Sequence, residues 1–114
     1  MIYFNPATVL SPRDCIDQVQ VLYDGGIVNN IYSLAIVTWE GVDRIGIRWN
    51  VNQREWDDPA KVAGTVTCIG EPNSRGYPTW FILPDQFLTD LVSGSTEVAE
   101  IVREALKKLE QNEG

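Results

Sequence analysis

Two runs of β-branched and aromatic residues, separated by only two residues, constrain the fold of this chain more than any other sequence feature. The runs cover 31–39 and 42–50, and Glu40-Gly41 lies between them. Runs of this composition favour β-strands, and a two-residue connection containing glycine is typical of a hairpin. The sequence therefore predicts an antiparallel hairpin over 31–50.

The second run has two different faces. Side chains alternate between the two faces of a strand, and here the odd-numbered positions are apolar while the even-numbered ones are polar or glycine. The apolar positions are Ile45, Ile47 and Trp49, and the others are Arg44, Gly46, Arg48 and Asn50. We therefore expect one face of this strand in the core and the other to be a basic face.

Further strands and helices are predicted on both sides of the hairpin. The patterns favour strands over 19–23, 65–69 and 79–83, and helices over 85–92 and 96–111. The polar segment 51–64 predicts a loop that holds a short helical turn. Together these elements predict an α+β fold, with an antiparallel sheet of about 4–5 strands followed by C-terminal helices.

A length of 114 residues suits one domain, because two would leave each half with too little core. Residues 1–93 are expected to form a sheet-rich α+β domain ending in a short helix, and residues 94–114 a C-terminal amphipathic helix. This helix belongs either to the same domain or to an appended, engineered segment, because Gly94-Ser95 resembles a fusion junction. Its apolar stripe needs a cover, so self-association through 96–111 is one expectation.

The charge of the chain favours a protein partner. Nine basic residues against sixteen acidic ones give a net charge of −7, which disfavours attraction to nucleic acid or to an anionic membrane. Neither a signal peptide nor an apolar run of about 20 residues is seen, so we expect a cytoplasmic protein without a membrane span. Cys15 and Cys68 are expected as free thiols, with a disulfide as the alternative.

The residues of the common catalytic sites are missing or have another explanation. Without histidine, Ser-His-Asp and Cys-His sites are excluded, as is the most common zinc ligand. Neither common phosphate-binding glycine loop occurs. Glu55, Asp57 and Asp58 offer carboxylates to a hard cation, but their spacing is not that of a calcium loop. We expect no cofactor, no metal and no enzyme activity, although a carboxylate-pair enzyme stays open.

Arginine and aromatic residues give the strongest indication of a binding site. Arg44, Arg48 and Asn50 share one strand face, and Arg75 and Tyr77 lie in a glycine- and proline-rich loop. Such a set suits a phosphate or carboxylate ligand, with an aromatic ring available for stacking.

A structural interpretation of the same residue types competes with this one. In it Trp39, Trp49 and Trp80 fill the core, while Arg44 and Arg48 pair with acidic side chains on neighbouring strands.

Trp56 is a separate case, because it lies in the 51–64 segment among charged residues, with no apolar periodicity to bury it. It either anchors a partner, as tryptophan often does at interfaces, or folds back over the sheet.

Three segments together resemble a group of small bacterial proteins. They are Y-S-L-A at 32–35, I-G-I-R-W-N at 45–50 and G-E-P-N-S-R-G-Y-P-T-W-F-I-L-P at 70–84. The group pairs W-S-L-A and G-I-R-W-N strands with a closing S-R-G-x-P-T-W-F-[VI]-L-P segment, and this chain is longer than the group over 51–64. No activity is established for the group, so the resemblance implies a bacterial or phage origin and no particular reaction.

The order of elements also resembles that of small single-stranded DNA-binding coactivators and of the plant Whirly proteins. Two functional hypotheses result. The first is a non-catalytic interaction protein, such as a bacterial or phage regulator or inhibitor, that binds another protein through 51–64 and the Arg75 loop. The alternative is a single-stranded nucleic-acid binder that uses Arg44, Arg48, Arg75 and exposed aromatic residues, with an affinity that falls steeply with salt.

Overall fold

The fold is a mixed α+β arrangement built on one antiparallel sheet, as the sequence predicts. The computed structural model describes residues 1–28, 31–86, 88 and 96–113, with 110–113 described by their backbone only. Four strands form the sheet in the order β1-β2-β3-β6, and β6 pairs antiparallel with β3. These strands are β1 (Ile16–Asp24), β2 (Tyr32–Trp39), β3 (Val42–Trp49) and β6 (Phe81–Leu83).

The β2–β3 hairpin confirms the prediction for 31–50 almost to the residue. Ile36 pairs with Ile45, and Tyr32 pairs with Trp49 near the open end. Glu40 and Gly41 both have positive φ, at 50° and 83°. Two-residue turns with this backbone match the twist of the strands, which explains the short connection.

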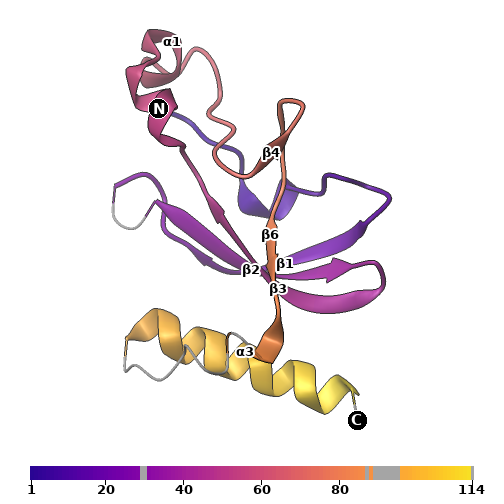
Figure 1. The fold of residues 1–114 in the computed structure, drawn as a ribbon. Helices are drawn as coiled ribbons and strands as arrows, with labels where there is room; N and C mark the ends of the chain where they lie inside the picture. The colour runs from indigo at the N-terminus through magenta and orange to yellow at the C-terminus, as the bar shows by residue number, and fades with distance from the viewer. Residues whose placement is uncertain (29–30, 87, 89–95, 114) are drawn as a thin grey trace.

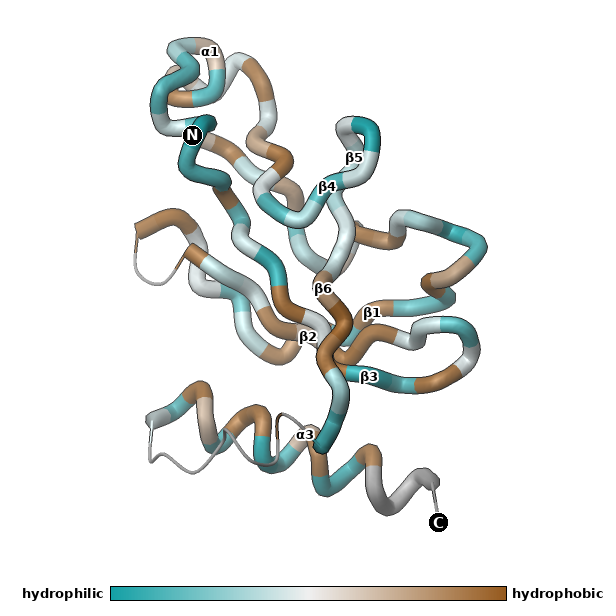
Figure 2. The backbone as a smooth tube through the Cα atoms, in the orientation of Figure 1, coloured by the Kyte–Doolittle hydropathy of each residue, from teal (hydrophilic) through white to brown (hydrophobic). Residues whose placement is uncertain are grey.

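One face of the sheet is covered by α3 (Glu97–Glu113), which follows the helix predicted over 96–111 (Figures 1 and 2). The core between them consists of buried apolar side chains from both layers and of Leu88, which lies between β6 and α3 in the chain. They are Leu34, Ile36, Ile45, Leu88, Val102, Ala105, Leu106 and Leu109. The apolar stripe of α3 is thus covered by the sheet of its own chain, and burying it removes apolar surface from water.

The opposite face of the sheet is covered by the N-terminal segment, which includes η1 (Pro6–Thr8), and by Trp80. The second core cluster consists of Val9, Ile16, Ala35, Val37 and Trp80. The Trp80 indole N–H donates to the Val9 carbonyl at 2.9 Å, so this buried ring has its polar atom satisfied.

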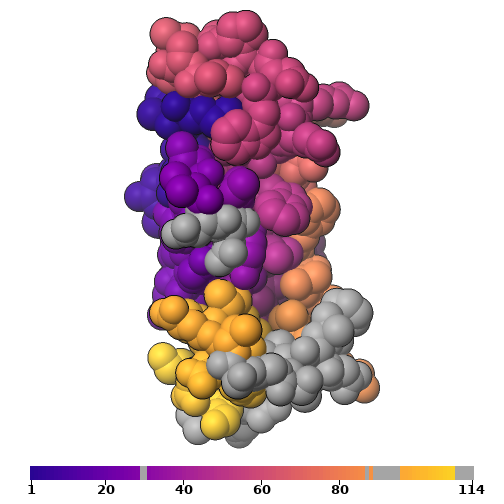
Figure 3. All heavy atoms as spheres, turned by 90° about the vertical axis from the view of Figure 1, so that its left-hand side faces the viewer, coloured from indigo at the N-terminus to yellow at the C-terminus, as the bar shows by residue number. Residues whose placement is uncertain are grey.

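The segment between β3 and β6 contains short elements. These are η2 (Gln53–Asp57), α1 (Pro59–Val62), β4 (Asn73–Ser74) and β5 (Tyr77–Pro78). Two short helices therefore replace the single helical turn predicted for 51–64. In Figure 3 the part of this segment that contains η2 and α1 lies at one end of the molecule, and α3 lies at the other.

The strand predicted over 65–69 is wrong. Only Cys68 forms a bridge there, with Tyr3, and the backbone N–H of Ile69 donates to a side chain instead of to a neighbouring strand. The β-branched composition of this segment favours a strand, but its backbone has other hydrogen-bond partners, an isolated bridge at Cys68 and the Glu55 carboxylate at Ile69.

Part of the sequence prediction lies outside the described residues. Of the helix predicted over 85–92, only Asp85, Gln86 and Leu88 are described, all three as helical. The Gly94-Ser95 junction is not among the described residues. Both cysteines are free thiols, which confirms the prediction. None of the described helices is long and apolar enough to span a membrane.

Candidate functional site

Arg48 does not form part of an exposed basic face. Its side chain is only 2% exposed, and its guanidinium donates to the carbonyl oxygens of Ile69, Pro72 and Thr79. The guanidinium carbon also lies 6.0 Å from the centre of the Trp80 ring, which is a cation–π distance. The predicted pairing of Arg48 with an acidic side chain across the strand is therefore replaced by bonds to loop carbonyls.

Burial lowers the pKa of Arg48 to about 10, and the negative charge of Glu55 opposes this shift. At neutral pH the guanidinium is still charged. The N–H donors of a buried cation need acceptors, and here the three carbonyl oxygens accept hydrogen bonds from the guanidinium. Arg48 therefore holds the 69–79 segment against β3 rather than presenting a charge to solvent.

Asn50 is buried as well, at the end of β3. Its amide nitrogen donates to the Gly26 carbonyl at 2.8 Å and to the Asp24 carboxylate at 3.3 Å. Its amide oxygen accepts from the Ser33 hydroxyl at 2.7 Å. These bonds join the ends of β1, β2 and β3, so the role that the structure shows for Asn50 is internal.

Glu55 has an internal role that the sequence, which offers it only as a ligand for a hard cation, does not predict. Only 3% of it is exposed, and its carboxylate accepts from the backbone N–H groups of Asn52, Ile69 and Gly70 at 3.0, 2.9 and 2.8 Å. The Lys61 ammonium donates to it at 2.7 Å. This one carboxylate therefore joins η2, α1 and the 69–70 backbone.

Burial alone raises the pKa of Glu55, but the donors from Asn52, Lys61, Gly70 and Ile69 outweigh it and lower the pKa below its usual value. The carboxylate is thus charged at neutral pH and already occupied. Among the described residues, no group of three or more acidic or cysteine side chains is close enough to hold a metal ion.

Two exposed tryptophans lie outside this buried network. Trp49 is 48% exposed and Trp56 is 44% exposed, and both line a hollow of about 340 Å³. The other residues of this hollow are Asn52, Gln53 and Glu71. We call these five residues the tryptophan hollow. The prediction that Trp49 fills the core is wrong, and Trp56 does not fold back into the sheet.

Backbone hydrogen bonds position Trp49 and Glu71 beside each other. The Trp49 N–H donates to the Glu71 carbonyl at 2.6 Å, and the Glu71 N–H donates back to the Trp49 carbonyl at 3.0 Å. The Trp49 ring also meets Tyr32 edge-on, with centroids 6.1 Å apart. Trp49 belongs to the same face as Ile45 and Ile47, but only the latter two contribute to the core under α3.

Trp56 follows Glu55 directly in η2, and η2 is fixed by a capping box. The Asn52 side chain accepts from the Glu55 N–H, while the Glu55 carboxylate accepts from the Asn52 N–H. Because Glu55 points into the protein, its neighbour Trp56 is left at the surface in a defined position. The burial of Glu55 and the exposure of Trp56 are thus two results of one arrangement.

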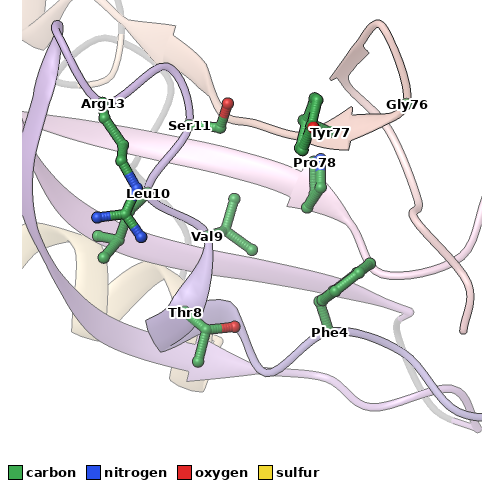
Figure 4. Close-up of a pocket in the computed structure, with 9 residues that line it drawn as sticks. All are labelled: Phe4, Thr8, Val9, Leu10, Ser11, Arg13, Gly76, Tyr77 and Pro78. Carbon is green, nitrogen blue, oxygen red and sulfur yellow. The ribbon is translucent and has the colours of Figure 1, made fainter.

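A second hollow lies between the N-terminal segment and the β4–β5 hairpin (Figure 4). Its volume is about 580 Å³, and mainly apolar side chains line it, with Arg13 as its cation. The lining residues are Phe4, Thr8, Val9, Leu10, Ser11, Arg13, Gly76, Tyr77 and Pro78. Tyr77 is 66% exposed, and Arg75 lies next to this hollow at the hairpin turn, with a φ of 55°.

The six residues predicted for binding do not form one site. Arg48 and Asn50 are inside the protein, and Arg44 is half-buried on β3 opposite Val37. Trp56 lies in the tryptophan hollow, whereas Arg75 and Tyr77 belong to the β4–β5 hairpin. The exposed residues of the prediction thus belong to two separate places on the surface, Trp56 to one, and Arg75 and Tyr77 to the other.

No protein family, curated protein or solved structure matches this chain. The resemblances to the small bacterial group and to the single-stranded DNA-binding proteins therefore stay expectations from the sequence.

Proposed function

We propose that this chain is a non-catalytic interaction domain that binds a protein partner through the 51–64 segment and the 70–78 loop. The observation that carries the proposal is the exposure of Trp49 and Trp56 in one hollow, where those two segments meet. A regulator or inhibitor would act in this way, and the sequence resemblance adds only a bacterial or phage origin to the proposal.

Exposed tryptophans on a fixed base are what a binding surface needs. Tryptophan is enriched among the residues that dominate binding energy, and it loses little conformational entropy when it is already positioned. Here the backbone pairing with Glu71 positions Trp49, and the capping box positions Trp56. In the free protein the two half-exposed indoles are in contact with water. A partner that buries their apolar surface therefore gains binding free energy.

The nucleic-acid alternative has less support. It needs Arg44, Arg48 and Arg75 on one accessible surface, but Arg48 is buried and donates to loop carbonyls. The other two arginines lie on different elements, β3 and the β4–β5 hairpin. The net charge of −7 adds a long-range repulsion of phosphates.

The proposal is tested by affinity capture from a bacterial lysate with the immobilised chain, followed by measurement of the affinity for each partner identified. We expect Trp56→Ala to weaken binding by about 10-fold or more, as interface tryptophans do, and Arg75→Ala to weaken it less. Val66→Ala is the control, because Val66 is an exposed apolar residue outside both segments and outside both hollows.

Wild-type affinity of both Trp56→Ala and Arg75→Ala for every captured partner would show that the site is misplaced. A parallel titration with a labelled single-stranded oligonucleotide tests the alternative. Binding that falls steeply with salt would favour nucleic acid over protein.

A further inference from the structure

We propose that the tryptophan hollow binds a cationic side chain, arginine or lysine, presented by the protein partner. This inference rests on the proposed function, because it assigns the chemistry of the partner at the same surface. It follows from the charges that line the hollow and from the two indole rings.

The five residues of the hollow include one charged group and no cation. They are Trp49, Asn52, Gln53, Trp56 and Glu71. The Glu71 carboxylate has no hydrogen bond or ion pair with any residue that the structure describes, and Glu71 is exposed. The hollow therefore offers a negative charge that is not neutralised from within the protein.

The indole rings add a second attraction for a cation. The face of an aromatic ring carries the negative part of its quadrupole, and among protein side chains tryptophan binds cations best. Trp49 and Trp56 bring two such rings to a hollow that also contains a carboxylate. Both features favour the same kind of occupant.

Apolar and anionic side chains are less favourable occupants of the tryptophan hollow. A purely apolar side chain would cover Glu71 without pairing its charge, and desolvation of an unpaired carboxylate is costly. An anionic group would be repelled by Glu71 and by the net charge of −7. A cationic side chain pairs with the Glu71 carboxylate and is not repelled by it. The negative net charge of the chain also attracts a cation from a distance.

The residues around the tryptophan hollow do not remove its preference for a cation. An adjoining hollow of about 380 Å³ shares Asn52, Gln53 and Glu71 and adds Arg54 and Asp57. Arg54 and Asp57 carry opposite charges, so the residues that line the two hollows together keep the negative net charge of Glu71. Two further cations belong to the interior of this end of the molecule. Lys61 is paired with Glu55 at 2.7 Å. Arg48 is buried, donates to the carbonyls of Ile69 and Pro72, and interacts with the negative charge of Glu55.

The test uses a blocked tripeptide, acetyl-Gly-Arg-Gly-amide, and its citrulline counterpart, which has the same shape without the charge. Titrations of the isotope-labelled protein follow the indole N–H signals of the four tryptophans by NMR. We expect the arginine peptide to shift the signals of Trp49 and Trp56 and to leave those of Trp39 and Trp80. The citrulline peptide should bind about 2- to 5-fold more weakly, as expected for an exposed cation–π contact.

Glu71→Gln and Glu97→Gln form a matched pair of variants. Each removes one negative charge, but Glu97 lies on α3, away from the hollow. We expect Glu71→Gln to weaken binding of the arginine peptide by a similar factor, and Glu97→Gln to leave it unchanged. Because the Glu71 side chain has no partner in the described part of the chain, its replacement should not affect folding.

Equal affinity of the wild-type protein for the two peptides, an absence of binding, or equal effects of the two variants would overturn the inference. Its failure is distinct from that of the proposed function. If Trp56→Ala weakens a captured partner while these tests fail, the surface binds protein without a cation. If Trp56→Ala leaves every captured partner bound while these tests succeed, the cation site stands and the proposed function is wrong.

Discussion

The two ends of the molecule are held together by opposite kinds of interaction. Under α3 the contacts are apolar, with Val102, Ala105, Leu106 and Leu109 packed against the sheet. At the other end, the 51–72 segment is held by Arg48 and Glu55, which are both buried and charged. Apolar packing is non-directional and spread over many contacts, whereas a buried ion depends on a few bonds of defined geometry.

This difference explains why tryptophans can be exposed at the polar end. There the carboxylate of Glu55 and the guanidinium of Arg48 fix the backbone from inside, so Trp49 and Trp56 are not needed for a core. At the α3 end the buried apolar side chains hold the helix on the sheet. A partner could reach these buried side chains only if the helix were displaced. Binding is therefore expected at the end that does not depend on apolar burial.

The largest effect is expected from Glu55→Ala. This change removes the acceptor of three backbone N–H groups and of Lys61, and leaves those donors without a partner in the interior. We expect a loss of about 3–5 kcal/mol in the free energy of unfolding, measured by urea denaturation. Glu100→Ala, on the exposed side of α3, is the control. Similar losses for the two variants would contradict the assigned role of Glu55.

Gly70→Ala should have the next largest effect. Gly70 has a φ of 65°, and an added Cβ would collide with the Trp49 carbonyl oxygen and lie 2.7 Å from the Arg48 guanidinium. Strained backbone and overpacking together should cost about 3 kcal/mol, again by urea denaturation. Gly76→Ala tests the backbone contribution alone, because Gly76 has a φ of 84° and open space around it. The comparison fails if both substitutions cost the same.

A smaller effect is expected from pH. The folded state holds the pKa of Glu55 below its value in the unfolded chain, so this group binds fewer protons in the folded state between the two values. Its contribution to stability is complete above the unfolded pKa and is lost as the pH falls through the folded one. Urea midpoints measured from pH 7 to pH 3 should fall more steeply for the wild type than for Glu55→Gln. Parallel curves would show that Glu55 does not titrate differently in the two states.

The parts of the fold that were predictable are those with a regular apolar pattern. The hairpin over 31–50 and the helix over 96–111 have side-chain periods of a strand and of a helix, and both are confirmed to within two residues at each end. The spacing of the apolar residues is enough to predict these elements, because an element that buries one face has apolar side chains at its own period, 2 for a strand and 3.6 for a helix.

The polar end was not predictable in the same way. The alternation in β3 correctly separates Arg48 and Asn50 from the apolar face, but it does not show that loop carbonyls cover them. Those carbonyls belong to residues 20 or more positions away, and their approach depends on the whole chain. A local signal did exist for Glu55, because Asn52-x-x-Glu55 is a capping-box pattern, but nothing in it indicates burial of the carboxylate.

The position of Trp80 has a consequence for synthesis of the chain on the ribosome. The β2–β3 hairpin is complete by Trp49, but one of its faces is covered by Trp80, whose indole reaches Val9, 71 positions earlier. The other face is covered by α3, which follows the hairpin by almost 50 residues in the chain. Until both have been synthesised, the nascent hairpin presents two uncovered apolar faces, and exposed apolar surface of this kind favours aggregation or binding to a chaperone.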